Sequence, residues 1–151
     1  MELYQRYGPA LLRKAARLLG NESDAQDVVQ GLFVEMIRRG ERQRDLPYLY
    51  RAINNRCLNF LRDSGNRERL LQKQEAALRG PVRTRCDDVV LGVDLVCKLI
   101  DRLDDKCGEV LIYRYFDDLT QDEIAELSGT SRKTVGTRLA RIREAVKELV
   151  G

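Results

Sequence analysis

The chain has 151 residues, of which 43% are hydrophobic and 34% are charged, and its formal net charge is +3. This composition is typical of a soluble, folded protein of one ordinary domain or two small ones. The chain has no histidine, which is the commonest general base, and no glycine-rich phosphate loop, so an enzyme is the weaker hypothesis. With three prolines and 6% aromatic residues, an all-α fold is favoured over a β-sandwich or barrel.

The cysteines argue against a metal site. Cys57, Cys86, Cys97 and Cys107 form no C-x-x-C pair, and no histidine is present to complete a zinc site. We therefore expect no metal and no cofactor. No apolar run approaches the roughly 20 residues that span a bilayer, and none resembles a signal sequence. We expect a cytoplasmic protein with reduced cysteines and no membrane insertion.

The first part of the chain contains three helical patterns of apolar residues. We expect these helices from 4 to 20, from 23 to about 40 and from 47 to 64. Ser23 and Gln26 have the spacing of a capping box at the start of the second helix. Pro47 is well placed for the first turn of the third. Three helices joined by short loops can enclose a small core.

A basic segment follows, in which six basic residues outnumber three acidic ones between positions 65 and 87. Gly80-Pro81 prevents a continuous helix across it. We therefore predict two small helical domains, at 1–64 and 88–151, joined by a basic linker at 65–87.

The second domain begins with two further apolar patterns, which predict a helix from Val89 to Leu103 and a shorter one from Cys107 to Phe116. The next segment, LTQDEIAELSGTSRKTVGTRLARIREAVKEL, reads as two helices separated by a short break. Thr120 and Glu123 form a capping box for the first of them. Gly129 suits a left-handed helix end, and Ser131 is a good N-cap for the last helix.

Charge is distributed unevenly along this domain. Positions 88–126 hold eleven acidic and four basic residues, whereas positions 127–151 hold two acidic and six basic ones. On the last helix, Lys133, Thr137 and Arg141 lie on the side opposite the apolar stripe. A helix-turn-helix whose second helix starts with short polar and basic side chains suits entry into the DNA major groove. The alternative is an ordinary helical hairpin with an incidentally basic face.

Two parts of the chain resemble one known family. The segment VLIYRYFDDLTQDEIAELSGTSRKTVGTRLARIRE resembles the promoter-binding C-terminal domain of bacterial extracytoplasmic-function (ECF) sigma factors. The segments LYQRYGPALLRKAARLLGNESDAQDVVQGLFVEMIRR and LPYLYRAINNRCLNFLRD are similar to the N-terminal domain of that family. The resemblance implies a non-catalytic subunit that binds core RNA polymerase, recognises the −35 promoter element as duplex and helps to open the −10 element.

The resemblance also implies a role for individual residues. Contacts to the −35 duplex are expected from Ser131, Arg132, Lys133, Thr134, Thr137, Arg138 and Arg141. Contacts to the melted −10 element are expected from Tyr48, Arg51, Asn55, Asn59 and Arg62, a polar stripe that contains amides and arginines. Contacts to the polymerase are expected from Asp24, Asp27 and Gln30.

Some positions depart from the family pattern. Gly31 stands where the family commonly has Glu, Asn59 where it has Asp, and Tyr48 where it has Trp. Gly136 takes a position often held by Lys, which removes a possible phosphate contact. Asp104-Asp105 replaces a common proline-rich turn. These changes put individual contacts in doubt without disturbing the apolar spacing.

Two other classes of function stay open at this point. A stand-alone helix-turn-helix regulator would need only the C-terminal half of the chain. A sigma mimic that sequesters an anti-sigma protein would need only the N-terminal half. Because no sensory extension is recognisable, the resemblance also suggests control in trans by an anti-sigma protein that covers one of these surfaces.

Overall fold

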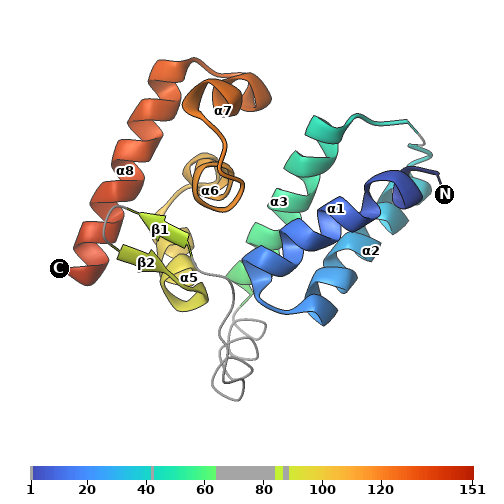
Figure 1. Ribbon diagram of the computed structural model, residues 1–151, viewed down its shortest axis with the longest axis horizontal. Coiled ribbons are helices and arrows are strands. Elements are labelled where there is room, and N and C mark those ends of the chain that lie inside the picture. The colour runs from blue at the N-terminus through green and yellow to red at the C-terminus, as the bar shows by residue number, and fades with distance from the viewer. Residues whose placement is uncertain (1, 42, 64–83, 87–88) are drawn as a thin grey trace.

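The computed structural model describes residues 2–41, 43–63, 84–86 and 89–151, and its architecture is all-α apart from one short hairpin (Figure 1). In chain order the elements are α1 (Glu2–Leu19), α2 (Glu22–Arg38), α3 (Leu46–Arg62), β1 (Thr84–Cys86), β2 (Val89–Leu91), α5 (Val93–Arg102), α6 (Asp105–Leu111), the π-helical turn η1 (Ile112–Phe116), α7 (Gln121–Ser128) and α8 (Arg132–Val150). Helices α1 to α3 form an N-terminal unit, and the elements from β1 to α8 form a C-terminal unit beside it.

The N-terminal unit is a three-helix bundle in which α1 packs on α2 and α3 packs against both. The start of α2 differs from the prediction, because Asn21 rather than Ser23 is the N-cap and its side chain accepts a 3.0 Å hydrogen bond from the Asp24 N–H. Pro47 lies in the first turn of α3, as predicted, and Asp45 caps this helix. The fully buried core side chains include Leu11, Leu19, Met36, Leu49, Ile53 and Leu61.

The helix predicted from Val89 to Leu103 is wrong at its first turn. Residues Val89–Leu91 pair antiparallel with Thr84–Cys86, and α5 begins only at Val93. Gly92, in an extended conformation, separates the strand from the helix. The apolar spacing fits both structures, and the β-branched pair Val89-Val90 favours the strand. Most of the predicted linker lies outside the described residues, but its positions 84–86 form β1.

The pair Asp104-Asp105, which replaces the proline-rich turn of the family, starts α6. The Asp104 carboxylate accepts a 2.8 Å hydrogen bond from the Cys107 N–H and so caps this helix. That hydrogen bond lowers the pKa of Asp104. The helix predicted from Cys107 to Phe116 therefore begins earlier, and its last turn is the π-helical η1.

The helix-turn-helix is as predicted. Thr120 and Glu123 form both hydrogen bonds of a capping box at the start of α7. Gly129 ends α7 in the left-handed conformation, with φ 67° and ψ 29°, which glycine adopts without strain. Ser131 caps α8. The core beneath these helices includes Leu99, Ile100, Val110, Leu111, Ile124, Val135, Leu139 and Ile142.

All four cysteines are buried and free. Across the described ranges, no helix combines the length and the hydropathy needed to cross a bilayer. Within the same ranges, no group of three Cys, Asp or Glu residues is placed to hold a metal ion.

Candidate nucleic-acid and polymerase surfaces

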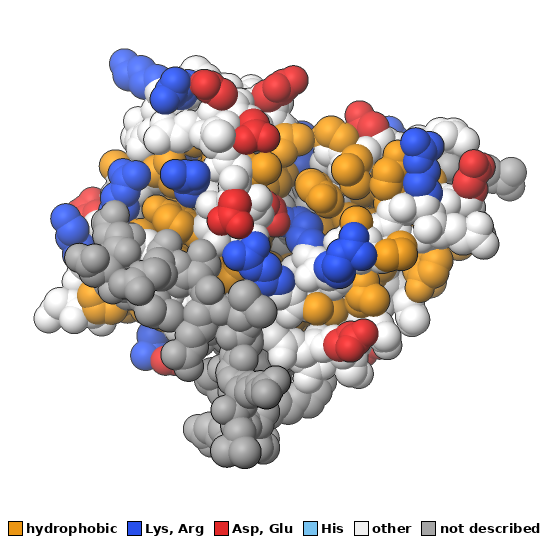
Figure 2. All heavy atoms as spheres, viewed as in Figure 1, with side chains coloured by type: hydrophobic (Ala, Val, Ile, Leu, Met, Phe, Trp, Pro, Cys, Tyr) orange, Lys and Arg blue, Asp and Glu red, His pale blue; other side chains and the backbone are white. Residues whose placement is uncertain are grey.

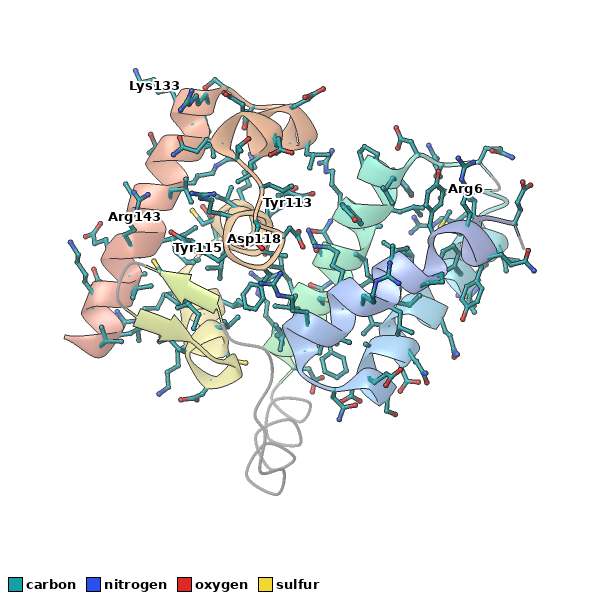
Figure 3. All side chains as sticks on the ribbon, viewed as in Figure 1. Arg6, Tyr113, Tyr115, Asp118, Lys133 and Arg143 are labelled. Carbon is teal, nitrogen blue, oxygen red and sulfur yellow. The ribbon has the colours of Figure 1, made fainter. Side chains whose placement is uncertain are left out.

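The first turn of α8 presents two cations to solvent. The side chain of Lys133 points away from the molecule at the start of this helix, and no described residue forms an ion pair with it (Figure 3). Arg132 is also exposed and lies 3.6 Å from Asp122 of α7, in a pair whose side chains are 67% and 73% exposed. A pair so open to water is weak and is easily exchanged for a phosphate. Both cations are therefore available to an anionic ligand.

The hydroxyl groups at the start of α8 already have local partners. Ser131 Oγ accepts a 3.1 Å hydrogen bond from the Thr134 N–H and lies 3.0 Å from Thr134 Oγ1. The Thr137 hydroxyl donates a 3.1 Å hydrogen bond to the carbonyl of Lys133. These groups support the helix start, and Thr137 is exposed beside Lys133 on the same face.

Two of the predicted DNA contacts lie closer to the protein interior than expected. Arg138 and Arg141 are half-buried, and Arg141 has a buried Nη1 atom without a normal hydrogen bond in the described residues. Burial raises the pKa of the Cys107 thiol to about 11, and the charges of these two arginines oppose that rise. Both arginines therefore lie near α6. The expectation that Arg141 lies on the fully solvent-facing side of α8 is wrong.

The polar stripe on α3 is present, but part of it is engaged. Asn55 and Asn59 are exposed. Arg51 Nε lies 3.6 Å from Glu109 Oε1, and Arg62 forms an ion pair with Asp105. Both acidic partners belong to α6, so each arginine of this stripe has an ion-pair partner in the C-terminal unit, although the Arg51 side chain is still 52% exposed.

Tyr48 is fixed by residues of the loop that precedes α3. Its hydroxyl donates a 3.0 Å hydrogen bond to Glu41, and the Arg44 guanidinium lies 4.6 Å from its ring centroid. Arg44 also pairs with Glu41 at 3.2 Å. The hydrogen bond from Tyr48 is the main cause of the lowered pKa of Glu41, whereas burial and Glu41 raise the pKa of Tyr48. The sequence pattern did not indicate a role for Glu41 and Arg44, although both lie within the seven residues before the tyrosine.

On α2, Asp27 and Gln30 are exposed, as a protein-binding role requires. Asp24, by contrast, is only 1% exposed and its backbone N–H is held by the Asn21 cap, so its carboxylate is not on the surface where a partner would dock. Exposed apolar residues lie further along the same helix, with Val34 at 54% and Ile37 at 61% exposure. The sequence did not predict their exposure, because apolar residues of an amphipathic helix are expected to face the core.

Gly31, where the family commonly has Glu, lies against the side chain of an arginine from α3. A Cβ atom at this position would lie 3.0 Å from Nη1 of Arg56, whose side chain crosses α2 from α3. An open groove beside it is lined by Asp27, Val28, Arg56, Asn59, Phe60 and Asp63. Glycine therefore leaves room for an arginine between the two helices.

Charged residues also meet where the two units touch. Lys14 of α1 pairs with Asp117, and Arg17 lies 3.5 Å from Asp118. The Lys14 ammonium is 5.2 Å from the ring centroid of Tyr50 and 5.9 Å from that of Tyr113. Figure 2 shows acidic and basic side chains close together in the middle of this face, between the two units.

Comparison with known families assigns both units. The sigma-70 region 2 model matches residues 3–67, and the sigma-70 region 4 model matches residues 95–146. The chain is 28% identical over 135 residues to the RNA polymerase sigma factor SigV of Bacillus subtilis (strain 168), covering 85% of this chain and 77% of SigV. It is 28% identical over 158 residues to the RNA polymerase sigma factor NccH of Alcaligenes xylosoxydans xylosoxydans, covering 99% of this chain and 85% of NccH.

Two solved structures share the fold. CnrH in complex with the cytosolic domain of CnrY superposes with a TM-score of 0.55 at 25% identity, covering 99% of this chain and 85% of CnrH. The sigma factor RpoE in complex with the anti-sigma factor NepR from Bartonella quintana gives a TM-score of 0.51 at 19% identity. The match covers 99% of this chain and 94% of the chain in that structure. With both sigma-70 regions present in family order and relatives aligned along most of its length, this chain belongs to the ECF sigma factors.

Proposed function

We propose that this non-catalytic protein directs core RNA polymerase to promoters in the cytoplasm, with a separate DNA surface on each of its predicted domains, 1–64 and 88–151. The observation that carries this proposal is that one chain holds a helix-turn-helix with exposed cations and a helix with an exposed amide stripe. A stand-alone regulator would have no use for the second surface.

The −35 element would be bound as duplex by the start of α8. Lys133 and Arg132 lie in the first turn, where a recognition helix reaches base edges and phosphates. Thr137 is one turn further on. The helix N-terminus adds its partial positive charge to theirs. Arg138 and Arg141 are closer to α6, so they would contribute mainly to the local positive field.

The −10 element would be held in single-stranded form along α3. Asn55 and Asn59 expose amide groups that can donate and accept hydrogen bonds at base edges. Arg51 and Arg62, on the same stripe, could bind phosphates or stack on bases. Tyr48, fixed by Glu41 and Arg44, would limit the path of the strand at the loop end of the helix.

The polymerase would dock on the exposed side of α2. Asp27 and Gln30 offer polar contacts, and Val34 and Ile37 offer apolar area one to two turns further on. Such a mixture of an apolar patch and polar neighbours is typical of protein interfaces. Asp24, being buried, would act through the start of the helix rather than by direct contact.

Control by an anti-sigma protein is a further part of this proposal. Its support is that the similar protein CnrH was solved with the cytosolic domain of CnrY bound. A pull-down from native cells under several stress conditions should recover a second protein besides polymerase. Recovery of polymerase alone in every condition would contradict this part.

The main proposal is tested by adding the purified protein to core polymerase with a genomic promoter library and sequencing the run-off transcripts. We expect initiation at a defined set of promoters. Duplex binding without promoter-specific initiation would favour a stand-alone regulator. Polymerase-independent binding to an anti-sigma protein, without DNA binding, would favour a sigma mimic.

A further inference from the structure

Helix α2 has a gap in its exposed face. Asp27, Gly31 and Val34 follow one another at steps of four and three positions, so they share one side of the helix. Asp27 and Val34 are exposed, and the glycine between them has no side chain. This row lies on the side of α2 that we assigned to the polymerase. A charge placed at Gly31 therefore becomes part of that surface.

An arginine of α3 fills this gap. Nη1 of Arg56 lies 3.0 Å, and its Cζ atom 4.0 Å, from the place that a Cβ atom of Gly31 would occupy. The arginine side chain lies in the open groove between α2 and α3, whose walls also include Asp27, Asn59 and Phe60. The missing side chain on α2 thus allows a guanidinium from the neighbouring helix to enter the exposed row.

Arg56 differs from other arginines of the N-terminal unit in its contacts. On the same helix, Arg51 and Arg62 each have an acidic partner in α6. At the end of α2, Arg39 pairs with Glu35 at 3.1 Å. Arg56 is half-buried, and no described residue forms an ion pair or a hydrogen bond with it. A cation that has lost part of its hydration without gaining a partner is costly, so a bound carboxylate would stabilise it.

The direction of Arg56 favours a protein partner over DNA. The stripe that we assigned to the −10 element includes Asn55, and Arg56 is turned from this residue by about 100° around the helix. Its guanidinium ends at Gly31, among the residues of α2 that we assigned to the polymerase. Asn59 lies where the stripe and the groove meet, so DNA is the alternative that the test must exclude.

We propose that Arg56 is a specificity-determining contact of the polymerase-docking surface, where its guanidinium replaces the side chain that Gly31 lacks and pairs with a carboxylate of the polymerase. This inference rests on the proposed docking along α2. The surface presents an anion at Asp27 and a cation one turn further on, so the matching polymerase surface carries the opposite order of charge. Because the planar guanidinium binds a carboxylate with two parallel hydrogen bonds, the contact selects position as well as charge.

Three substitutions change the charge of this contact in steps. Arg56→Lys keeps the charge but loses the planar fork, Arg56→Gln removes the charge, and Arg56→Glu reverses it. The matched control is Arg13→Gln, which removes an exposed cation of α1 in the same unit. Circular dichroism and thermal melting check that each variant folds.

The first measurement is the affinity of each full-length protein for core RNA polymerase, by surface plasmon resonance at several salt concentrations. We expect Arg56→Gln to weaken binding about tenfold and Arg56→Glu to weaken it further, because a reversed charge adds repulsion. Arg56→Lys should keep part of the affinity, and Arg13→Gln should stay within about twofold of the wild type. The salt dependence of binding should fall in Arg56→Gln, which a mere loss of packing would not cause.

The second measurement identifies what Arg56 touches. The four native cysteines are buried, so Arg56→Cys supplies an accessible thiol for a benzophenone crosslinker. We expect irradiation to join it to a polymerase subunit, at a peptide that contains an acidic residue, with or without promoter DNA.

Unchanged polymerase affinity of Arg56→Gln, a loss of affinity without a change in salt dependence, or a crosslink to promoter DNA alone would each overturn the inference. If the wild type still binds polymerase and initiates at promoters in those cases, the proposed function stands without it. A wild type that does not bind core polymerase would refute both.

Discussion

The two candidate DNA surfaces differ in what their cations contact. On α8, Lys133 has no ion-pair partner among the described residues, and Arg132 has only an exposed one. On α3, both arginines of the stripe pair with acids of α6. The excess of acid between positions 88 and 126 is thus not a general solvated face. Four of its eleven acids pair with cations on α1 and α3: Asp105, Glu109, Asp117 and Asp118.

This difference suggests an order of events in promoter recognition. A surface with accessible cations can meet duplex DNA at once, because long-range attraction acts on charges that are not already neutralised. A surface whose arginines are paired must first lose its partners. Duplex recognition by α8 would therefore precede strand capture by α3.

The largest expected effect comes from removing each pair of cations in turn. Arg51→Ala with Arg62→Ala should reduce promoter-specific initiation roughly a hundredfold, because each lost DNA contact costs about 1–3 kcal/mol. Binding of a −35 duplex should change little. Arg132→Ala with Lys133→Ala should reduce both duplex binding and initiation. Run-off transcription and duplex anisotropy, measured side by side, check this.

The control for that experiment is Arg6→Ala with Arg13→Ala, which removes two exposed cations of α1. It should leave initiation within about twofold, as surface substitutions usually do. If the α3 variant lost duplex binding as strongly as the α8 variant, the division of labour between the two surfaces would be wrong.

A smaller effect separates residues within α8. Lys133→Ala should weaken duplex binding about tenfold, change base preference and reduce the salt slope by about 1, as a direct contact does. Arg141→Ala should have a weaker effect on affinity, because its side chain lies partly against α6. Titrations of duplex binding at several salt concentrations measure both. Equal losses for the two variants would show that Arg141 reaches the DNA despite its burial.

Much of the fold follows from local rules that a sequence displays. The capping box of Thr120 and Glu123, the left-handed Gly129, the cap at Ser131 and the place of Pro47 each depend on residues within one turn, and each forms as predicted. The errors occur where two local solutions compete. Asn21 lies two positions before Ser23 and caps α2 in its place, and the apolar residues Val89–Leu91 fit a strand as well as a helix.

The contacts between the units could not be predicted in this way. Lys14 and Asp117 are 103 positions apart, and nothing in the sequence around either residue indicates which acid meets which base. The sequence showed the excess of acidic residues at positions 88–126 but not which basic residues they contact. For the same reason it did not show the burial of Asp24 and Arg141, whose exposure depends on how neighbouring elements pack.

A more modest effect concerns the glycine in α8. Gly136→Ala should raise the free energy of unfolding by about 1 kcal/mol, because glycine loses more backbone entropy in a helix. An added Cβ would approach only Gln121 Oε1, at an ordinary 3.8 Å. Urea denaturation measures the change, and Ala140→Gly on the exposed side of the same helix should lower stability by a similar amount. A destabilised Gly136→Ala variant would mean that α8 needs a bend at this position.

The smallest expected effect is a change in the pH dependence of stability at the capping box of α7. Hydrogen bonds from Thr120 hold the pKa of Glu123 below its ordinary value of 4.5. Because the folded-state pKa is lowered, the stabilisation by Glu123 is present above the unfolded pKa and is lost as pH falls through the folded one. Glu123→Gln keeps a capping partner without a titrating carboxylate, so its unfolding free energy should depend less on pH below 4.5 than that of the wild type. Urea denaturation between pH 3 and 6 measures the unfolding free energy of each protein. Glu126→Gln, on the exposed side of α7, is the control. Identical pH profiles for the two variants would show that the cap does not depend on charge.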